Sequence, residues 1–305
     1  MTASFTLAIL PDTQKYSQSY PQIFTSQTRW IAEHKEDLNI AFVLHEGDVT
    51  NGNVEYHWEN AKASMSVLDG VLPYAIVLGN HDMGPGGDCT VRKSHLFNRY
   101  FPVSKYEQLS TFGGTFEPNL LDNSFHLFHA GETEWLVLAL EYLPRDQVLE
   151  WANEIIATHV GRRVIFLTHS HVCSDNSLHG DRSVHKWNPT DHQISNETGG
   201  VNNGIDVWNK LLKKHSGTFL SFNGHFTENG GSGLVSKEGD AGNQVIQMLA
   251  NYQLMDNGGN GYLRIVECAP SKGIISVSTY SPFLDEYLTD SRNQFTLTGL
   301  DLADL

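Results

Sequence analysis

The chain has 305 residues, 40% of them hydrophobic, and carries a formal net charge of −15 at pH 7. This length and composition suffice to bury a substantial core, and the negative charge disfavours nucleic acid and other polyanions as partners. The three cysteines, Cys89, Cys173 and Cys268, are widely spaced in the sequence, which argues against a disulfide framework and against a thiolate zinc site.

No apolar run approaches the ~18–20 residues that a membrane-spanning helix requires. The first residues, MTASFTLAILPD, predict a strand followed by a loop and lack the basic region of a signal peptide. We therefore expect a soluble protein, cytoplasmic as the sequence stands, although an exported form without its signal peptide would have the same sequence. The oligomeric state is unknown from the sequence.

Strands and helices alternate at the start of the chain. Apolar strands are predicted over 5–10, 40–48 and 71–82, and amphipathic helices over 21–38 and 55–70. This alternation is typical of a sheet whose central strands are parallel.

The rest of the chain predicts further strands and two more helices. No repeat or linker divides it, so we predict one domain over 1–305, with a core of about 5–283 and a C-terminal tail over 284–305. In chain order, we expect a hairpin (124–142), a helix (144–158), a strand (162–171), a long polar loop (172–203), a helix (204–215), a strand (217–225) and then antiparallel strands rich in Gly and Asn.

Polar residues with metal-binding side chains follow five of the predicted strands. In open α/β sheets, binding sites gather beyond the carboxyl ends of strands, so five such ends on one edge would bring these residues together. Each segment alone is a weak signal, because turns such as Gly-Asp after a strand are common and only Gly-Asn-His-Asp is rarer. Their order and placement together predict a shared metal site. The segments are Pro11–Gln14, Gly47–Asn51, Gly79–Asp82, Thr168–His171 and Gly224–His225.

In chain order these segments, with the two residues that follow the last of them, have the sequences PDTQ, GDVTN, GNHD, THSH and GHFT. The chain thereby resembles the calcineurin-like metallophosphoesterases, whose pattern is D-x-H, G-D-x-x-D/N, G-N-H-D/E, a lone His and G-H-x-H. The resemblance covers most of the chain up to about residue 284. It implies an α/β fold of mixed α+β character, namely a four-layer α-β-β-α sandwich of two mixed β-sheets flanked by helices.

Carried over by position, the resemblance implies a dinuclear metal centre. Asp48 would bridge two divalent cations, and a hydroxide activated by them would be the nucleophile. His81 would stand beside the scissile phosphate as general acid, oriented by Asn51. The remaining metal ligands would be Asn80, His169 and His225 for one cation, and Asp12 and Gln14 for the other.

Two departures from the family pattern fall on the same side of this centre. Gln14 stands where the family has a ligand His, and Thr227 stands at the last His of G-H-x-H. Both changes leave an oxygen-rich site that favours Mn²⁺, Mg²⁺ or Ca²⁺. We expect two divalent ions, with Mn first and Fe, Zn, Mg and Ca as alternatives, and one site weak or empty. Thr227, a water molecule or a loop His would close the depleted coordination sphere.

Three further positions near these segments have less specific interpretations. His171 is either a surface residue of the polar loop or a residue that faces the substrate or replaces a ligand. His45 is predicted to be buried or to support the ligands without binding metal. Asn251 is expected in a loop near the site.

The predicted activity is metal-dependent hydrolysis of phosphoric esters (EC 3.1), as a phosphomonoesterase or a phosphodiesterase. The alternative is a non-catalytic or mononuclear metal- or phosphate-binding protein with a degraded first metal site. Gln14 and Thr227 favour that alternative, whereas the retention of His81, Asn51 and Asp48 opposes it. A nuclease is disfavoured because the charge leaves no basic track for a phosphate backbone. The expected partner is a phosphate-ester substrate, which the sequence does not identify.

Overall fold

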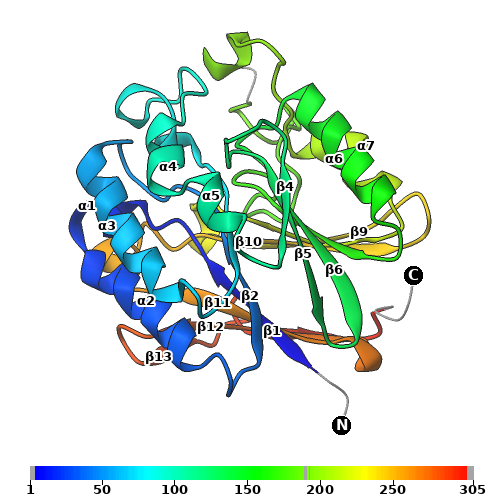
Figure 1. The fold of residues 1–305 in the computed structure, drawn as a ribbon. Helices are drawn as coiled ribbons and strands as arrows, with labels where there is room; N and C mark the ends of the chain where they lie inside the picture. Colours follow the sequence, from blue (N-terminus) through cyan, green and yellow to red (C-terminus); the bar gives the residue numbers. More distant parts are fainter. Residues whose placement is uncertain (1–3, 189–190, 192, 301–305) are drawn as a thin grey trace.

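Two mixed β-sheets pack face to face in the computed structural model, which describes residues 4–188, 191 and 193–300 (Figure 1). Within these residues the first sheet has seven strands in the order β13-β12-β11-β1-β2-β3, with β14 beside β12. Only β1, β2 and β3 pair in parallel with one another. The strands are β1 (Phe5–Leu10), β2 (Ile40–His45), β3 (Tyr74–Ile76), β11 (Leu263–Ala269), β12 (Ile274–Ser281), β13 (Glu286–Leu288) and β14 (Phe295–Leu297).

The second sheet, counted over the same described residues, also has seven strands, in the order β4-β5-β6-β7-β8-β10-β9. Its centre, from β6 through β7 and β8 to β10, is parallel, and antiparallel strands flank it on both sides. The strands are β4 (Phe112–Thr115), β5 (Ser124–Ala130), β6 (Thr133–Ala139), β7 (Arg163–Leu167), β8 (Thr218–Asn223), β9 (Ser232–Glu238) and β10 (Gln244–Ala250).

Helices cover the outer face of each sheet (Figure 1). Those outside the first sheet are α1 (Gln14–Ser19), α2 (Pro21–Glu33) and α3 (Glu55–Met65), and those outside the second are α6 (Asp146–Thr158) and α7 (Gly204–Lys210). Three short helices lie in the connections: α4 (His95–Tyr100), α5 (Val103–Tyr106) and α8 (Asp256–Gly259). The predicted four-layer α-β-β-α sandwich is therefore confirmed.

Alternation along the buried strands explains why the layers stack. In β1, Leu7 and Ile9 belong to the apolar core between the two sheets, whereas Ala8 and Leu10 belong to the core under the helices. Successive side chains of a strand point to opposite faces, so a strand that is apolar at every position is buried on both sides.

Most predicted elements exist, with shorter bounds. The helix predicted over 21–38 ends at Glu33, and the strand predicted over 71–82 is limited to Tyr74–Ile76. The prediction that the strands after residue 230 are antiparallel is confirmed for the pairing of β10 with β9 and was wrong for its pairing with β8, which is parallel. This pairing brings the end of β10 to the same edge as the end of β8.

The residues expected to form a C-terminal tail instead extend the first sheet. β13 and β14 both pair with β12, and Phe295, Leu297 and Leu300 pack on the core between the sheets. The last part of the predicted tail, 301–305, lies outside the described residues.

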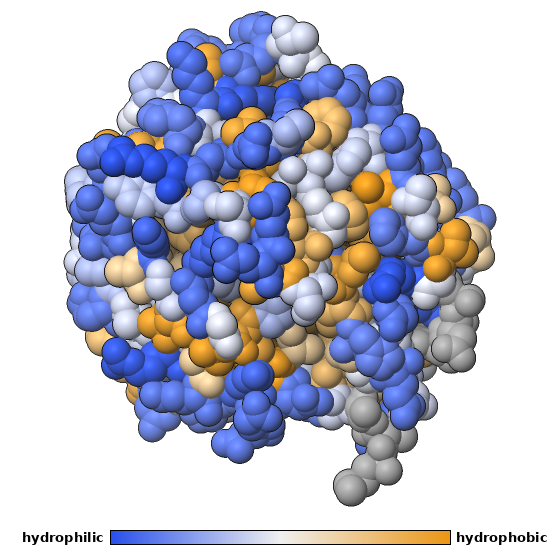
Figure 2. All heavy atoms as spheres, viewed as in Figure 1, coloured by the Kyte–Doolittle hydropathy of each residue, from blue (hydrophilic) through white to orange (hydrophobic). Residues whose placement is uncertain are grey.

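The surface facing the viewer in Figure 2 is largely hydrophilic, with apolar side chains in separate patches. In the described part of the chain, no helix combines the length and the apolar character needed to span a membrane.

Five strand ends gather at one edge of the sandwich. The parallel pairing of β1 with β2, of β2 with β3, and of β7 with β8 gives the strands within each group a common direction. Asp12, Asp48 and Asn80 follow the ends of the first group, and His169 and His225 follow the ends of the second. The two groups meet, because the His169 ring lies within hydrogen-bonding distance of Asn80.

Candidate metal centre

Four of the predicted ligands converge around the ring of His169. Its Nε2 lies 3.3 Å from Asp48 Oδ2, 3.2 Å from Asn80 Oδ1 and 3.2 Å from His225 Nδ1. The ligand atoms of Asp48, His169 and His225 all lie within 4.8 Å of one another. His169 and Asp48 are buried, whereas Asn80 and His225 are half-buried and form the open side of the cluster.

The tautomer of His169 decides what this cluster is suited to bind. Its Nδ1 lies 2.8 Å from the backbone carbonyl of Glu46, which only accepts hydrogen bonds, so Nδ1 carries the hydrogen. In the neutral ring, Nε2 then presents a lone pair to the oxygen atoms of Asp48 and Asn80. Acceptors that face one another in a buried site are satisfied by a cation, so these residues fit a divalent metal ion.

The charges of the cluster support the same conclusion. Burial disfavours a charged His169, but the carboxylates of Asp48 and Asp12 outweigh it and raise the His169 pKa to about 9. Burial also opposes ionisation of Asp48, yet the charge of His169 holds the Asp48 pKa at about 2. In the metal-free protein, a proton on His169 therefore occupies the position of the positive charge that a cation would supply.

The backbone at this site is held in uncommon conformations. Asp48 has φ of 47° and His225 has φ of 72°, in the left-handed region that residues other than glycine seldom adopt. Such strain often marks functional sites, where the surrounding structure imposes it. The glycines of the motifs permit the close approach: a Cβ at Gly79 would overlap the Asp48 carboxylate, and a Cβ at Gly224 would overlap that of Asp12.

The Asp12 side of the centre is built differently, from amide groups. Gln14 donates from Nε2 to Asp48 Oδ2 at 2.8 Å. Asp12 Oδ2 accepts from Asn251 Nδ2 at 2.8 Å and from Gln253 Nε2 at 3.1 Å. Here N–H donors already satisfy the carboxylates, and Gln14 would have to turn its amide to offer Oε1 to a metal. Burial raises the Asp12 pKa well above its ordinary value.

Thr227 and the amide side chains take different positions relative to Asp12. Thr227 lines a cavity beside His225, and among the described residues its hydroxyl makes no hydrogen bond to Asp12. The contacts to Asp12 come instead from Asn251, which we expected near the site, and from Gln253, which the sequence analysis missed. The contact of Gln253 would have been predictable from the parallel direction of β10, because this direction places the residues after Ala250 at the same edge as the candidate metal ligands.

His81 and Asn51 lie at the open edge of the centre. The His81 backbone N–H donates to Asp48 Oδ1 at 2.9 Å, and its half-exposed ring makes no hydrogen bond within the described residues. The Asn51 amide donates to Gln18 Oε1 at 2.8 Å, which leaves its own oxygen for another partner. The roles predicted for these two residues remain predictions.

Asp82, the last residue of GNHD, ties the loop of Asp48 to the loop of His81. Its carboxylate accepts from the backbone N–H groups of Gly79, Val49 and Thr50 at 2.8–3.0 Å. Burial, together with the nearby charge of Asp48, raises its pKa to about 7. Asp82 therefore positions the ligand loops and takes no place in the ligand cluster.

The two other histidines near the motifs support the fold. His171 is fully buried, and its Nε2 lies 2.6 Å from Gln247 Oε1. Neither the surface position nor the substitute-ligand role that we considered for it holds. His45 is buried against Thr13 at 2.9 Å, and burial lowers its pKa to about 3, in agreement with a supporting position.

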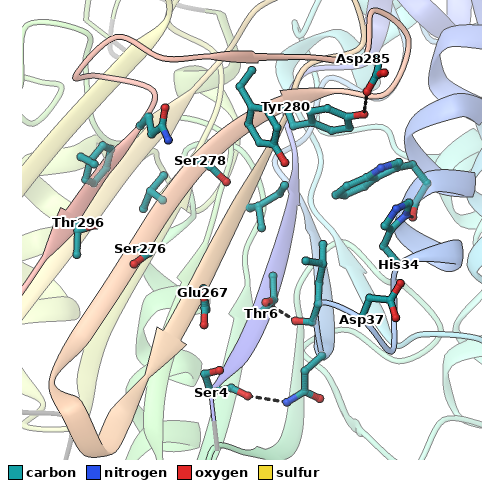
Figure 3. Close-up of a pocket in the computed structure, with 18 residues that line it drawn as sticks. Ser4, Thr6, His34, Asp37, Glu267, Ser276, Ser278, Tyr280, Asp285 and Thr296 are labelled. Carbon is teal, nitrogen blue, oxygen red and sulfur yellow. Dashed lines mark hydrogen bonds between the residues drawn. The ribbon is translucent and has the colours of Figure 1, made fainter.

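One cavity bordered by the described residues lies away from this centre. It measures about 760 Å³ and borders Ser4 and Thr6 at the start of β1, whereas Asp12 follows the end of that strand. Figure 3 shows that its labelled polar side chains are dispersed and that Tyr280 points toward Asp285. The Tyr280 hydroxyl donates to Asp285 Oδ1 at 2.6 Å. A second cavity of about 560 Å³ does adjoin the centre and is lined by His225, Phe226 and Trp187.

The fold and the site together define a metal-binding α-β-β-α sandwich protein. The family model of the calcineurin-like phosphoesterases matches residues 5–208. The chain therefore belongs to the calcineurin-like phosphoesterase family, and this membership supports a metal-dependent phosphoesterase.

The chain is also similar in sequence to an uncharacterized protein. The uncharacterized protein YvnB of Bacillus subtilis (strain 168) is 30% identical over 309 residues, which cover 98% of this chain and 22% of that protein. The chain thus spans about a fifth of that relative's length.

Two solved structures share the fold. The purple acid phosphatase PPD1 of yellow lupin (Lupinus luteus) aligns with a TM-score of 0.58 at 14% identity, over 98% of this chain and 54% of that one. A dimetal phosphatase from Danio rerio aligns with a TM-score of 0.57 at 13% identity, over 96% and 98%.

Proposed function

We propose that the protein is a hydrolase of phosphoric esters that uses a dinuclear metal centre, with Mn²⁺ as the first candidate ion. The observation that supports the proposal is the convergence of Asp48 Oδ2, Asn80 Oδ1 and His225 Nδ1 within 3.2–3.3 Å of His169 Nε2. Asp48, Asn80, His169 and His225 would hold the tighter cation, and Asp12 and Gln14 would complete the weaker site beside it.

The protein's own residues have distinct tasks in this scheme. When bound, divalent cations activate water as a nucleophile and offset the charge that develops on the phosphoryl oxygens. His81, anchored through its backbone to Asp48, would donate a proton to the leaving oxygen. Asn51 would orient the His81 ring through its free amide oxygen. The half-exposed His225 and Asn80 leave the centre open to a substrate.

The proposal is tested with the full chain and two chromogenic esters. Chelator treatment should abolish hydrolysis of p-nitrophenyl phosphate or bis-p-nitrophenyl phosphate, and Mn²⁺ should restore it. The preferred ester would separate phosphomonoesterase from phosphodiesterase activity. Absence of hydrolysis of both esters with each of Mn²⁺, Fe²⁺, Zn²⁺, Mg²⁺ and Ca²⁺ would contradict the proposal.

The second candidate function is a mononuclear metal- or phosphate-binding protein without turnover. The amide donors on Asp12 and Asp48 support it, because they satisfy both carboxylates without a cation. Metal analysis of the purified chain distinguishes the candidates. One tightly bound ion per chain together with no hydrolysis would favour the binding protein, and two ions with hydrolysis would favour the enzyme.

A further inference from the structure

A second group of metal-type ligands lies in the polar loop, outside the centre described above. The Cys173 Sγ, an oxygen of Asp175 and a ring nitrogen of His185 all lie within 4.8 Å of one another. This group shares no residue with the calcineurin-like motifs. Its members come from the segment 172–203, for which we predicted a long polar loop.

The turn that carries Cys173 and Asp175 is fixed by its own backbone. Cys173 N–H donates to Ser177 O at 2.9 Å, and Ser177 N–H donates to Asp175 Oδ1 at 3.0 Å. A bridge between Val172 and Leu178 closes the turn. Two of the three ligand atoms therefore stand in a preset arrangement, which lowers the entropy lost when a ligand binds.

His185 reaches this turn from a separate turn of the loop. Its Nε2 lies 3.4 Å from Asp175 Oδ2 and 3.0 Å from Ser177 Oγ. Its Nδ1 is buried and has no hydrogen-bond partner among the described residues. The neighbouring His179 is buried and stacks on Trp187 with ring centroids 4.8 Å apart, which forms a rigid wall beside His185.

Cys173 differs from the other two cysteines in its surroundings. It lines the cavity of about 560 Å³ that also reaches His225. Cys268 lies in the apolar core between the two sheets, and Cys89 lies in the core under the helices of the first sheet. Cys173 is thus the thiol placed to meet a solute.

The three ligand types together select a borderline-soft cation. Thiolate, imidazole and carboxylate are the ligands of Zn²⁺ and of its spectroscopic substitute Co²⁺, whereas Mg²⁺ and Ca²⁺ prefer oxygen alone. Zinc bonds of about 2.0–2.3 Å place tetrahedral ligand atoms within ~4 Å of one another. Small side-chain adjustments would therefore bring these three atoms to bonding distance.

We propose that Cys173, Asp175 and His185 form a third metal site that binds a zinc-type divalent cation. Three protein ligands leave the fourth position of a tetrahedral ion free, as in reactive zinc sites. Because Cys173, Asp175 and His185 all line the cavity beside His225, an anionic group of a molecule bound in that cavity would take this position. Binding displaces the thiol proton of Cys173 to solvent. The site does not depend on the proposed hydrolysis.

Cobalt spectroscopy tests this proposal without an activity assay. Co²⁺ bound to a thiolate gives a sulfur-to-metal charge-transfer band in the near ultraviolet, which the oxygen and nitrogen ligands of the main centre do not give. We expect the full chain loaded with Co²⁺ to show this band. The band should disappear in Cys173→Ser and weaken at least several-fold in His185→Gln. It should persist in the matched controls Cys89→Ala and Cys268→Ala.

A fourth variant separates this site from the main centre. Asp48→Asn should lose metal at the main centre and keep the charge-transfer band at full intensity. Loss of the band in Asp48→Asn, or its absence from the wild-type chain, would overturn the proposal, as would a band that survives Cys173→Ser. Circular dichroism checks that each variant is folded, and His185→Gln still tests the site if Cys173→Ser does not fold.

Discussion

The two sides of the metal centre satisfy their carboxylates in opposite ways. Around His169, lone pairs of a ring nitrogen, a carboxylate and an amide oxygen face one another. Around Asp12, amide N–H groups from Asn251 and Gln253 already occupy the carboxylate. The His169 side thus gathers ligand-type atoms from several residues at one point, whereas on the Asp12 side amide N–H groups occupy the carboxylate. Two sites that share Asp48 can thus differ widely in metal affinity.

Replacing Asp48 removes the residue common to both sides and should have the largest effect. We expect Asp48→Asn to weaken metal binding by more than ~100-fold and to abolish ester hydrolysis. Replacing a residue that only hydrogen-bonds to a metal ligand already lowers metal affinity by ~10–100-fold, and Asp48 is predicted to be a ligand itself. Titration calorimetry and metal analysis measure the loss. Asp240→Asn, an exposed aspartate, serves as the control. Retention of both metals would refute the bridging role.

Replacing His81 should separate turnover from metal binding. We expect His81→Ala to lower kcat by ~10²–10⁴-fold, the usual contribution of a general acid, with the metal content unchanged. Steady-state hydrolysis and metal analysis measure the two effects. The exposed His95→Ala is the matched control. Loss of metal in His81→Ala would contradict its placement outside the ligand set.

Replacing Gln14 by the His of the family pattern should reduce the difference in metal affinity between the two sides of the centre. Gln14→His removes an N–H donor from Asp48 Oδ2 and offers a metal ligand in its place. We expect the weaker site to bind Mn²⁺ or Zn²⁺ at least ~10-fold more tightly, a step comparable to other changes around metal ligands. Calorimetry would show the second binding event, and Gln22→His on the exposed side of α2 should not. An unchanged affinity would mean that Gln14 does not face the metal.

Thr227 should contribute least, although its position in the sequence pattern suggests a lost ligand. It makes no hydrogen bond to Asp12 in the described part of the chain, so we expect Thr227→Ala to change metal affinity by less than about two-fold, as substitutions away from special contacts do. Calorimetric titration with Mn²⁺ measures the change. A loss near ten-fold would show that the Thr227 hydroxyl binds the metal after all.

The periodicity of apolar residues and the order of the motifs were sufficient to predict the architecture and the positions of the candidate ligands at the strand ends. The apolar strands end at Leu10, His45 and Leu167, and the ligand segments follow each of them directly. Strand pairing then brings these ends together, a step that depends on the general rules of α/β sheets and not on details of side chains.

The direction of single side chains could not be predicted in the same way. Gln253 meets Asp12 across 241 positions of sequence, and that contact depends on the parallel pairing of β10. His171 turns inward because Gln247 offers it a buried partner. The Cys173 and His185 side chains lie close together because of the conformation of the loop between them. Hydrophobic periodicity does not predict loop conformations.

The proposed ligands of the tighter site follow strands of two different sheets. Asp48 and Asn80 follow strands of the first sheet, whereas His169 and His225 follow strands of the second. Elsewhere the two sheets are held together by an apolar core, and hydrophobic contacts of this kind are not directional. A bound cation would act as a cross-link between the two sheets at one edge. Amide hydrogen exchange near the ends of β2 and β8 would then slow on metal loading, while the opposite edge would keep its mobility.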